Sequence, residues 1–133
     1  MATIKLDKER KLLFSVQALD EINKKFGSLE KLHEEISKGS QYEQLSNIIW
    51  LITMMVNQAS LENNMDIDLG VKHGEKEIFL TEEYVKVKLR VGDLKKYRDV
   101  IYLAVVEGSD FESEEGEDAG DPDLKEIEAE KNG

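Results

Sequence analysis

One long apolar run constrains the fold of this 133-residue chain more than any other feature. Residues 40–61 hold the only tryptophan and two of the four methionines. Apolar residues recur there at the three- and four-residue steps of one helix face: Leu45, Ile48, Ile49, Ile52, Val56 and Ala59. Four further apolar residues widen that face: Trp50, Leu51, Met54 and Met55. They leave a narrow polar strip: Ser46, Thr53, Asn57 and Ser60. A helix that is apolar nearly all round is typical of a protein core.

The start and the length of this helix can also be read from the sequence. Ser40 and Glu43 have the spacing of a capping box, which marks a helix N-terminus. The continuous apolar part, residues 48–56, is far shorter than the roughly 20 residues of a membrane span. We therefore expect the central helix of a small soluble domain, with no membrane partner.

The charge is concentrated at the C-terminal end. Residues 107–133 contain 12 acidic residues and two lysines, whereas residues 1–106 contain 17 acidic residues and 16 Lys plus Arg. The near-neutral body gives no indication of nucleic-acid binding. We predict a domain at 1–108 and a disordered acidic tail at 109–133, because such a composition cannot bury enough apolar surface to fold alone. The absence of cysteine and of an apolar N-terminal segment predicts a cytoplasmic protein without a signal peptide.

The residues before the central helix predict a hairpin and two short helices. Residues 3–14 alternate between apolar and polar side chains on both sides of a turn placed at residues 7–10. A helix is expected from Ser15, its cap, to Gly27. A second one is expected from Ser28 to Gly39.

The residues after the central helix are less regular. Residues 62–76 are polar and lack a helical period, which indicates a loop with a short strand near residues 67–71. Residues 81–91 fit both a helix and a strand; the acidic residues after Thr81 favour a helix. A last helical stripe starts at Leu94 and is expected to end at Gly108. The predicted fold class is therefore α+β, mostly α: an N-terminal β-hairpin, then about five helices around a central hydrophobic helix.

The sequence provides no constellation of catalytic residues. His33 and His73 are isolated, and no phosphate-binding glycine motif or nucleophile elbow is present. Residues 64–75 approach a calcium-binding loop but have Leu69 where such a loop needs glycine. The basic cluster of Lys86, Lys88 and Arg90 is best interpreted as a solvated face. We expect a protein that is not an enzyme and has no catalytic residue, cofactor or metal site.

One family shares the pattern of the first sixty residues. The run ERKLLFSVQALDEINKKFGSLEKLHEEI followed by SNIIWLITMM resembles the tail assembly chaperones of long-tailed phages and gene transfer agents. The shared pattern is a hairpin whose second strand is basic and then aromatic, a helix of the form A-L-x-E-I/L-x-x-x-F/L-G, a short leucine-containing helix and an apolar helix with tryptophan. The resemblance covers residues 3–59 well and residues 80–107 loosely.

The resemblance implies a phage or prophage assembly factor in the host cytoplasm. Its implied partners are the tape measure protein and the tail tube protein, and it leaves open both a homo-oligomer and a longer frameshifted product. An amphipathic client helix would need an apolar groove, for which Trp50, Met54 and Met55 are the candidate residues. Two alternatives stay open: a small bacterial adaptor that binds other proteins, and an acidic regulator that mimics DNA through its tail.

Overall fold

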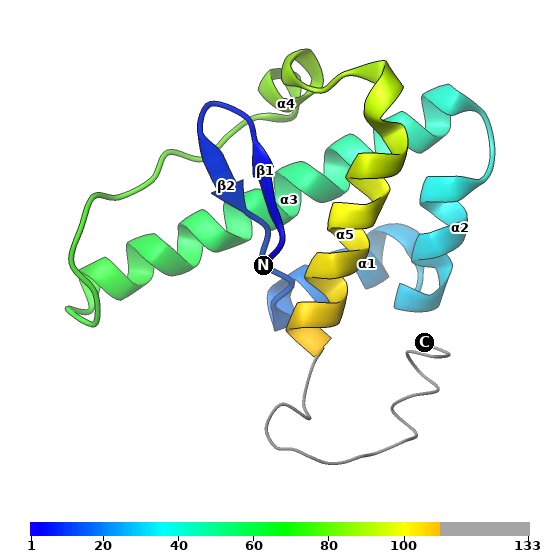
Figure 1. Ribbon diagram of the computed structural model, residues 1–133. Coiled ribbons are helices and arrows are strands. Elements are labelled where there is room, and N and C mark those ends of the chain that lie inside the picture. Colours follow the sequence, from blue (N-terminus) through cyan, green and yellow to red (C-terminus); the bar gives the residue numbers. More distant parts are fainter. Residues whose placement is uncertain (110–133) are drawn as a thin grey trace.

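The apolar run forms the helix around which the other elements pack (Figure 1). The computed structural model describes residues 1–109, so the predicted disordered tail lies outside the described residues. The predicted fold class is confirmed for the described part, which is mostly helical with an N-terminal antiparallel hairpin and five α-helices. The elements are β1 (Thr3–Lys5), β2 (Glu9–Lys11), α1 (Val16–Phe26), the 3-10 helix η1 (Leu29–Lys31), α2 (Leu32–Ser37), α3 (Gln41–Asp68), α4 (Glu82–Lys88), the 3-10 helix η2 (Val91–Asp93) and α5 (Leu94–Ser109).

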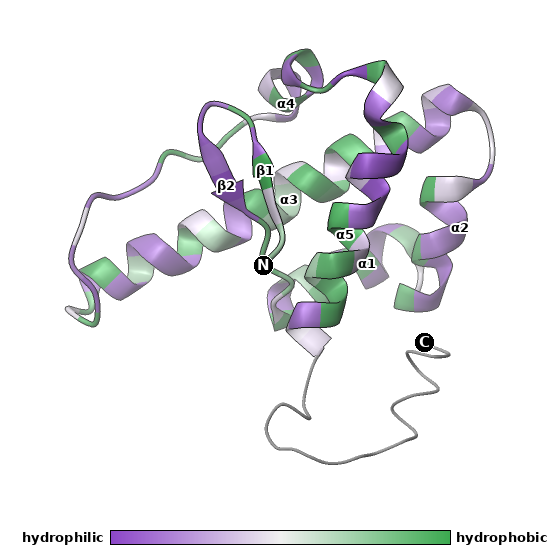
Figure 2. Ribbon diagram, in the orientation of Figure 1, coloured by the Kyte–Doolittle hydropathy of each residue, from purple (hydrophilic) through white to green (hydrophobic). Residues whose placement is uncertain are grey.

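Helix α3 begins at the predicted capping box and provides the largest part of the core. The Ser40 hydroxyl accepts the Glu43 N–H, and the Glu43 carboxylate accepts the Ser40 N–H. The helix contacts α1, α2, α4, α5 and β2. Its fully buried apolar residues lie between residues 48 and 56, in a stretch that Figure 2 colours mostly as hydrophobic: Ile48, Leu51, Ile52, Met55 and Val56.

The predicted end of this helix was wrong. Helix α3 continues from residue 61 to Asp68, through residues that we interpreted as a loop, and no strand forms at residues 67–71. This end projects beyond the other helices, and the chain then turns back beside it (Figure 1). We call residues 62–80 the arm. The polar residues of this helical end bond to the returning chain, which explains why the helix persists without an apolar period.

The hairpin is confirmed, but its turn lies earlier than predicted. Residues 9 and 10, which we predicted in the turn, belong to strand β2, and Arg10 pairs with Ile4 across the sheet. The inward face of both strands and their flanks is buried and includes Ile4, Leu6, Leu12 and Phe14. Arg10 occupies an inward position in this period-two pattern and is only 3% exposed.

The caps predicted at Ser15 and Thr81 are confirmed, whereas Ser28, expected to begin the second short helix, makes no capping hydrogen bond through its side chain. Ser15 accepts the Ala18 N–H at the start of α1, and Gly27 ends that helix with a φ of 99°. The segment after Gly27 folds as η1 followed by α2 rather than as one helix. Thr81 caps α4, so the helical alternative for residues 81–91 is the correct one, although the helix ends at Lys88.

Helix α5 is described to Ser109, one residue beyond the predicted end at Gly108. The backbone of Gly108 packs directly on Phe14, and a Cβ atom at position 108 would overlap with the Phe14 carbonyl oxygen. Close packing, rather than a helix stop, is therefore the reason for glycine at this position.

Candidate functional site

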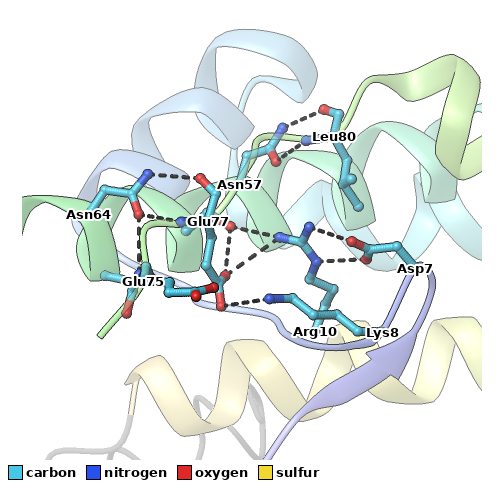
Figure 3. Close-up of polar contacts among 10 residues, drawn as sticks. Asp7, Lys8, Arg10, Asn57, Asn64, Glu75, Glu77 and Leu80 are labelled. Carbon is cyan, nitrogen blue, oxygen red and sulfur yellow. Dashed lines mark hydrogen bonds and ion pairs between the residues drawn. The ribbon is translucent and has the colours of Figure 1, made fainter. Parts of the chain in front are cut away.

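A buried arginine connects the hairpin to the arm (Figure 3). The Arg10 guanidinium donates to both Asp7 carboxylate oxygens at 2.8 Å, through Nε and Nη2. Its Nη1 donates to the Ser60 hydroxyl at 3.1 Å and lies 3.5 Å from Glu77 Oε1. Lys8 adds an ion pair to Glu77 at 3.3 Å. One cation thus joins the turn of the hairpin, the C-terminal half of α3 and the returning chain.

The returning chain is held by asparagine side chains of α3. We call residues 75–80 the return segment. The Asn57 amide donates to the Leu80 carbonyl at 2.8 Å and accepts the Leu80 N–H at 2.9 Å. The Asn64 amide does the same with Glu77, at 2.9 and 2.7 Å. Asn63 donates to the Glu75 carbonyl at 3.2 Å.

The spacing of these amides matches the length of the chain that they bind. Asn57 and Asn64 are two helical turns apart, which is about 10 Å along the axis. Three residues of extended chain, from Glu77 to Leu80, also span about 10 Å. All five hydrogen bonds go to main-chain atoms, so this contact orients the return segment without requiring particular side chains in it.

The polar strip that the sequence shows on the central helix therefore has a structural role. Ser60 is fully buried and bonds to Arg10 and Glu77, and Asn57 bonds to Leu80. Thr53 is 6% exposed, and its hydroxyl has no hydrogen-bond partner among the described residues. Asn57 and Ser60 thus contact the return segment. Ser46, at the other end of the strip, is exposed.

The arginine changes the ionisation of its partner and makes stability depend on pH. The hydrogen bonds from Arg10 lower the pKa of Asp7 to about 2. A depressed carboxylate pKa contributes stability above the unfolded pKa, and this contribution is lost as the pH falls through the folded pKa. We therefore expect the free energy of unfolding to decrease as the pH falls from about 4 to about 2.

Urea titrations at several pH values would measure this decrease, and Asp7→Asn should make it smaller. Glu107, whose pKa is lowered by a hydrogen bond from the N-terminal ammonium, should leave a residual decrease in that variant. If the free energy of unfolding of Asp7→Asn depends on pH as strongly as that of the unchanged chain, the contact between Arg10 and Asp7 is not the cause of the decrease.

The residues predicted for a partner surface occupy three different environments. Met55 is fully buried in the core, so it cannot line a surface of the folded domain. Trp50 is half-buried: its ring meets Phe26 edge to face at 5.8 Å, and the Lys25 ammonium lies 5.0 Å from its centre. Met54 is also half-buried and packs against the core. Trp50 and Met54 thus present only part of their surface to solvent.

A groove with an apolar floor lies elsewhere, between the first turns of α3 and the end of α4 with the residues that follow it. It has a volume of about 200 Å³. We call it the α3–α4 groove, and it is lined by Tyr42, Leu45, Ser46, Ile49, Lys86, Leu89, Arg90 and Val91. Tyr42 is 75% exposed and Val91 61% exposed, so both side chains are accessible beside the groove. Lys86 and Arg90 add positive charge to it.

The arm has a second group of exposed apolar side chains. The exposed members are Met65, Leu69, Val71, Ile78 and Phe79. They come from the end of α3, from the turn and from the return segment, so no single period in the sequence groups them.

Sequence reasoning missed both the arginine contacts and the groove. The period-two pattern of the hairpin already placed Arg10 on the inward face, and this was a usable signal. The seven-residue spacing of Asn57 and Asn64 was another. No local signal pairs Glu77 with Arg10, because these residues are far apart in the sequence.

The other candidate residues have no catalytic arrangement. His33 Nδ1 lies 2.6 Å from the Tyr102 hydroxyl on the surface, and His73 is exposed on the arm. Within residues 1–109, no group of three or more metal-ligating side chains is placed to hold an ion. The first five residues of the near-calcium loop, residues 64–68, belong to α3. Lys86 and Arg90 line the groove, whereas the Lys88 ammonium lies over the Tyr84 ring. No helix in the described part of the chain combines the length and hydropathy needed to cross a membrane.

Comparison with known proteins found no relative of this chain. No protein-family model matches the chain, and neither a curated protein nor a solved structure matches it.

Proposed function

We propose that this chain is a non-enzymatic tail assembly chaperone of a phage or prophage. In this role it binds the tape measure protein in the host cytoplasm and helps to recruit tail tube subunits. The proposal rests on the resemblance of residues 3–59 to that family, and the order of a hairpin, two short helices and a long apolar helix is compatible with it.

The observation that carries the proposal is the α3–α4 groove. Leu45, Ile49 and Leu89 provide an apolar floor, and the side chains of Tyr42 and Val91 stand exposed beside it. An amphipathic helix binds such a groove through apolar anchors at positions i, i+3, i+4 and i+7. A chaperone for a long helical client needs this kind of surface and no catalytic residues.

The basic residues of the groove restrict the client. Lys86 and Arg90 lie beside the apolar floor, so we expect the bound face of the client helix to carry acidic residues next to its apolar anchors. Charge complementarity of this kind increases the association rate and selects the orientation of the client more than it adds affinity.

Co-expression with the tape measure protein from the same genome tests the proposal. We expect the tape measure protein to become soluble and to co-purify with this chain. Tyr42→Glu and Val91→Glu should weaken the complex, since both side chains are exposed beside the groove and their replacement leaves the core intact. Leu69→Glu and Val71→Glu on the arm are matched controls of similar exposure.

The outcomes separate the proposal from the adaptor alternative. An insoluble tape measure protein, or a gene that does not lie near tail tube and tape measure genes, would contradict the chaperone function. The adaptor alternative is favoured by the exposed apolar side chains of the arm, and it predicts that the arm variants lose their partner while the groove variants keep it. The DNA-mimic alternative depends on residues outside the described part of the chain.

A further inference from the structure

The part of the chain around the groove is the most basic part of the described domain. Residues 84–98 contain six Lys plus Arg and a single acidic residue, a net charge of +5. Residues 110–133, which follow α5, contain 11 acidic residues and two lysines, a net charge of −9. The chain thus carries a basic groove and a strongly acidic segment at two ends of the same helix.

The acidic segment also has apolar residues that suit the groove. Leu124 and Ile127 are three residues apart, and the nearest acidic residues on either side of them are Asp123 and Glu128. This combination of apolar and acidic side chains complements a floor of leucine and isoleucine beside Lys86 and Arg90. An acidic segment without apolar residues would complement the positive charge of the groove but would not fill its apolar floor.

The length of the chain allows the contact within one molecule. Val91, in the groove, lies three residues before α5, whose 16 residues span roughly 24 Å. Leu124 lies 15 residues beyond the end of α5, and a flexible chain of that length has a root-mean-square reach of about 20 Å, which repulsion between like charges extends. A tether gives its highest effective concentration when its reach matches the span. Phe111 is too close to the end of α5 to reach the groove, since two residues extend at most about 7 Å.

We propose that residues 121–131 of this chain occupy the α3–α4 groove of the same molecule. Leu124 and Ile127 contact the apolar floor, and the neighbouring acidic residues pair with Lys86 and Arg90. The segment then acts as an internal competitor that a partner must displace. This inference goes beyond the proposed function, and its test contains no client protein, so the two can fail independently.

A paramagnetic label on the full chain tests the contact. Because the sequence has no cysteine, Ala129→Cys creates a single site for a nitroxide label. We expect the label to broaden the backbone amide signals of Ile49, Leu89 and Val91, and to leave that of Asp68 at the end of the arm unchanged. Ionic strength of about 1 M shortens the Debye length to about 3 Å and should restore the lost signals.

Charge and apolar variants make the test specific to the groove. Lys86→Glu with Val91→Glu should abolish the broadening at Ile49 and Leu89, while Lys72→Glu with Val71→Glu, which makes the same change on the exposed arm, should preserve it. Unchanged amide signals of the hairpin and α1 would show that the variants are folded.

Three results would overturn the proposal. The first is uniform or absent broadening in the labelled chain, and the second is broadening that persists in the groove variant. The third is broadening seen only when labelled chains are mixed with isotope-enriched unlabelled chains, because the occupant would then come from a second copy.

Discussion

Replacing Arg10 with methionine is expected to lower the free energy of unfolding by about 3 kcal/mol. Methionine preserves most of the buried volume but removes every contact of the guanidinium. Asp7 and Glu77 then lose their buried counter-charge, and the Ser60 hydroxyl loses a donor inside the core. Asp7 and Glu77 are 35% and 30% exposed, so water can solvate their carboxylates after Arg10 is removed. The expected destabilisation is therefore at the low end of the range for breaking a buried ion pair.

Lys8→Met is the matched control for this substitution. Lys8 also forms an ion pair with Glu77, but its side chain is 53% exposed, and its removal should cost less than about 0.5 kcal/mol. Urea denaturation of both variants measures the difference. A double-mutant cycle with Glu77→Gln then gives the coupling between arginine and the return segment. Equal losses in the two single variants would show that burial of Arg10 has no energetic role.

Replacing Gly108 with alanine is expected to destabilise the domain by about 2 kcal/mol. In an ordinary helix interior the same change stabilises by about 1 kcal/mol, because alanine is the better helix former. At Gly108 the new methyl group overlaps with the Phe14 carbonyl oxygen and also approaches the Phe14 ring. Helix α5 must then move away from the chain between the hairpin and α1. A decrease in the free energy of unfolding, where an ordinary helix would show an increase, identifies this close contact.

Gly92→Ala provides the control, since no atom lies within 4 Å of the Cβ position there and the backbone is compatible with alanine. We expect its midpoint of thermal unfolding to stay the same or to rise slightly, whereas that of Gly108→Ala falls. Stabilisation by Gly108→Ala would mean that the end of α5 is not packed on Phe14 in solution.

The sequence alone determined the order of the hairpin and the α-helices, although it also predicted a short strand near residues 67–71 that does not form. Signals that involve only near neighbours were reliable, such as the cap pair of Ser40 and Glu43, the cap at Thr81 and the left-handed glycine at position 27. These signals hold because capping bonds and backbone conformation depend on residues within one helical turn. The apolar period of the central helix was reliable for a similar reason, since a helix apolar nearly all round has to be buried.

The candidate site was only partly readable from sequence. Of the three residues chosen for a partner surface, Met55 is fully buried, while Trp50 and Met54 are covered in part by neighbouring side chains. An apolar residue on a wide apolar face can lie in the core or on the surface, and periodicity does not separate the two. The groove needed α3 and α4 to be placed side by side before it could be recognised.

Only the tertiary structure decided where α3 ends and which charge is buried. The helix continues to Asp68 because Asn63 and Asn64 bind the main chain of residues that follow them by 12 and 13 positions. Arg10 is buried because Ser60 and Glu77 meet it from two other parts of the chain. Sequence patterns predict a polar residue to be solvated unless its hydrogen-bond partner is known. Here the partners are distant in the sequence and come into contact only when the chain folds back along α3.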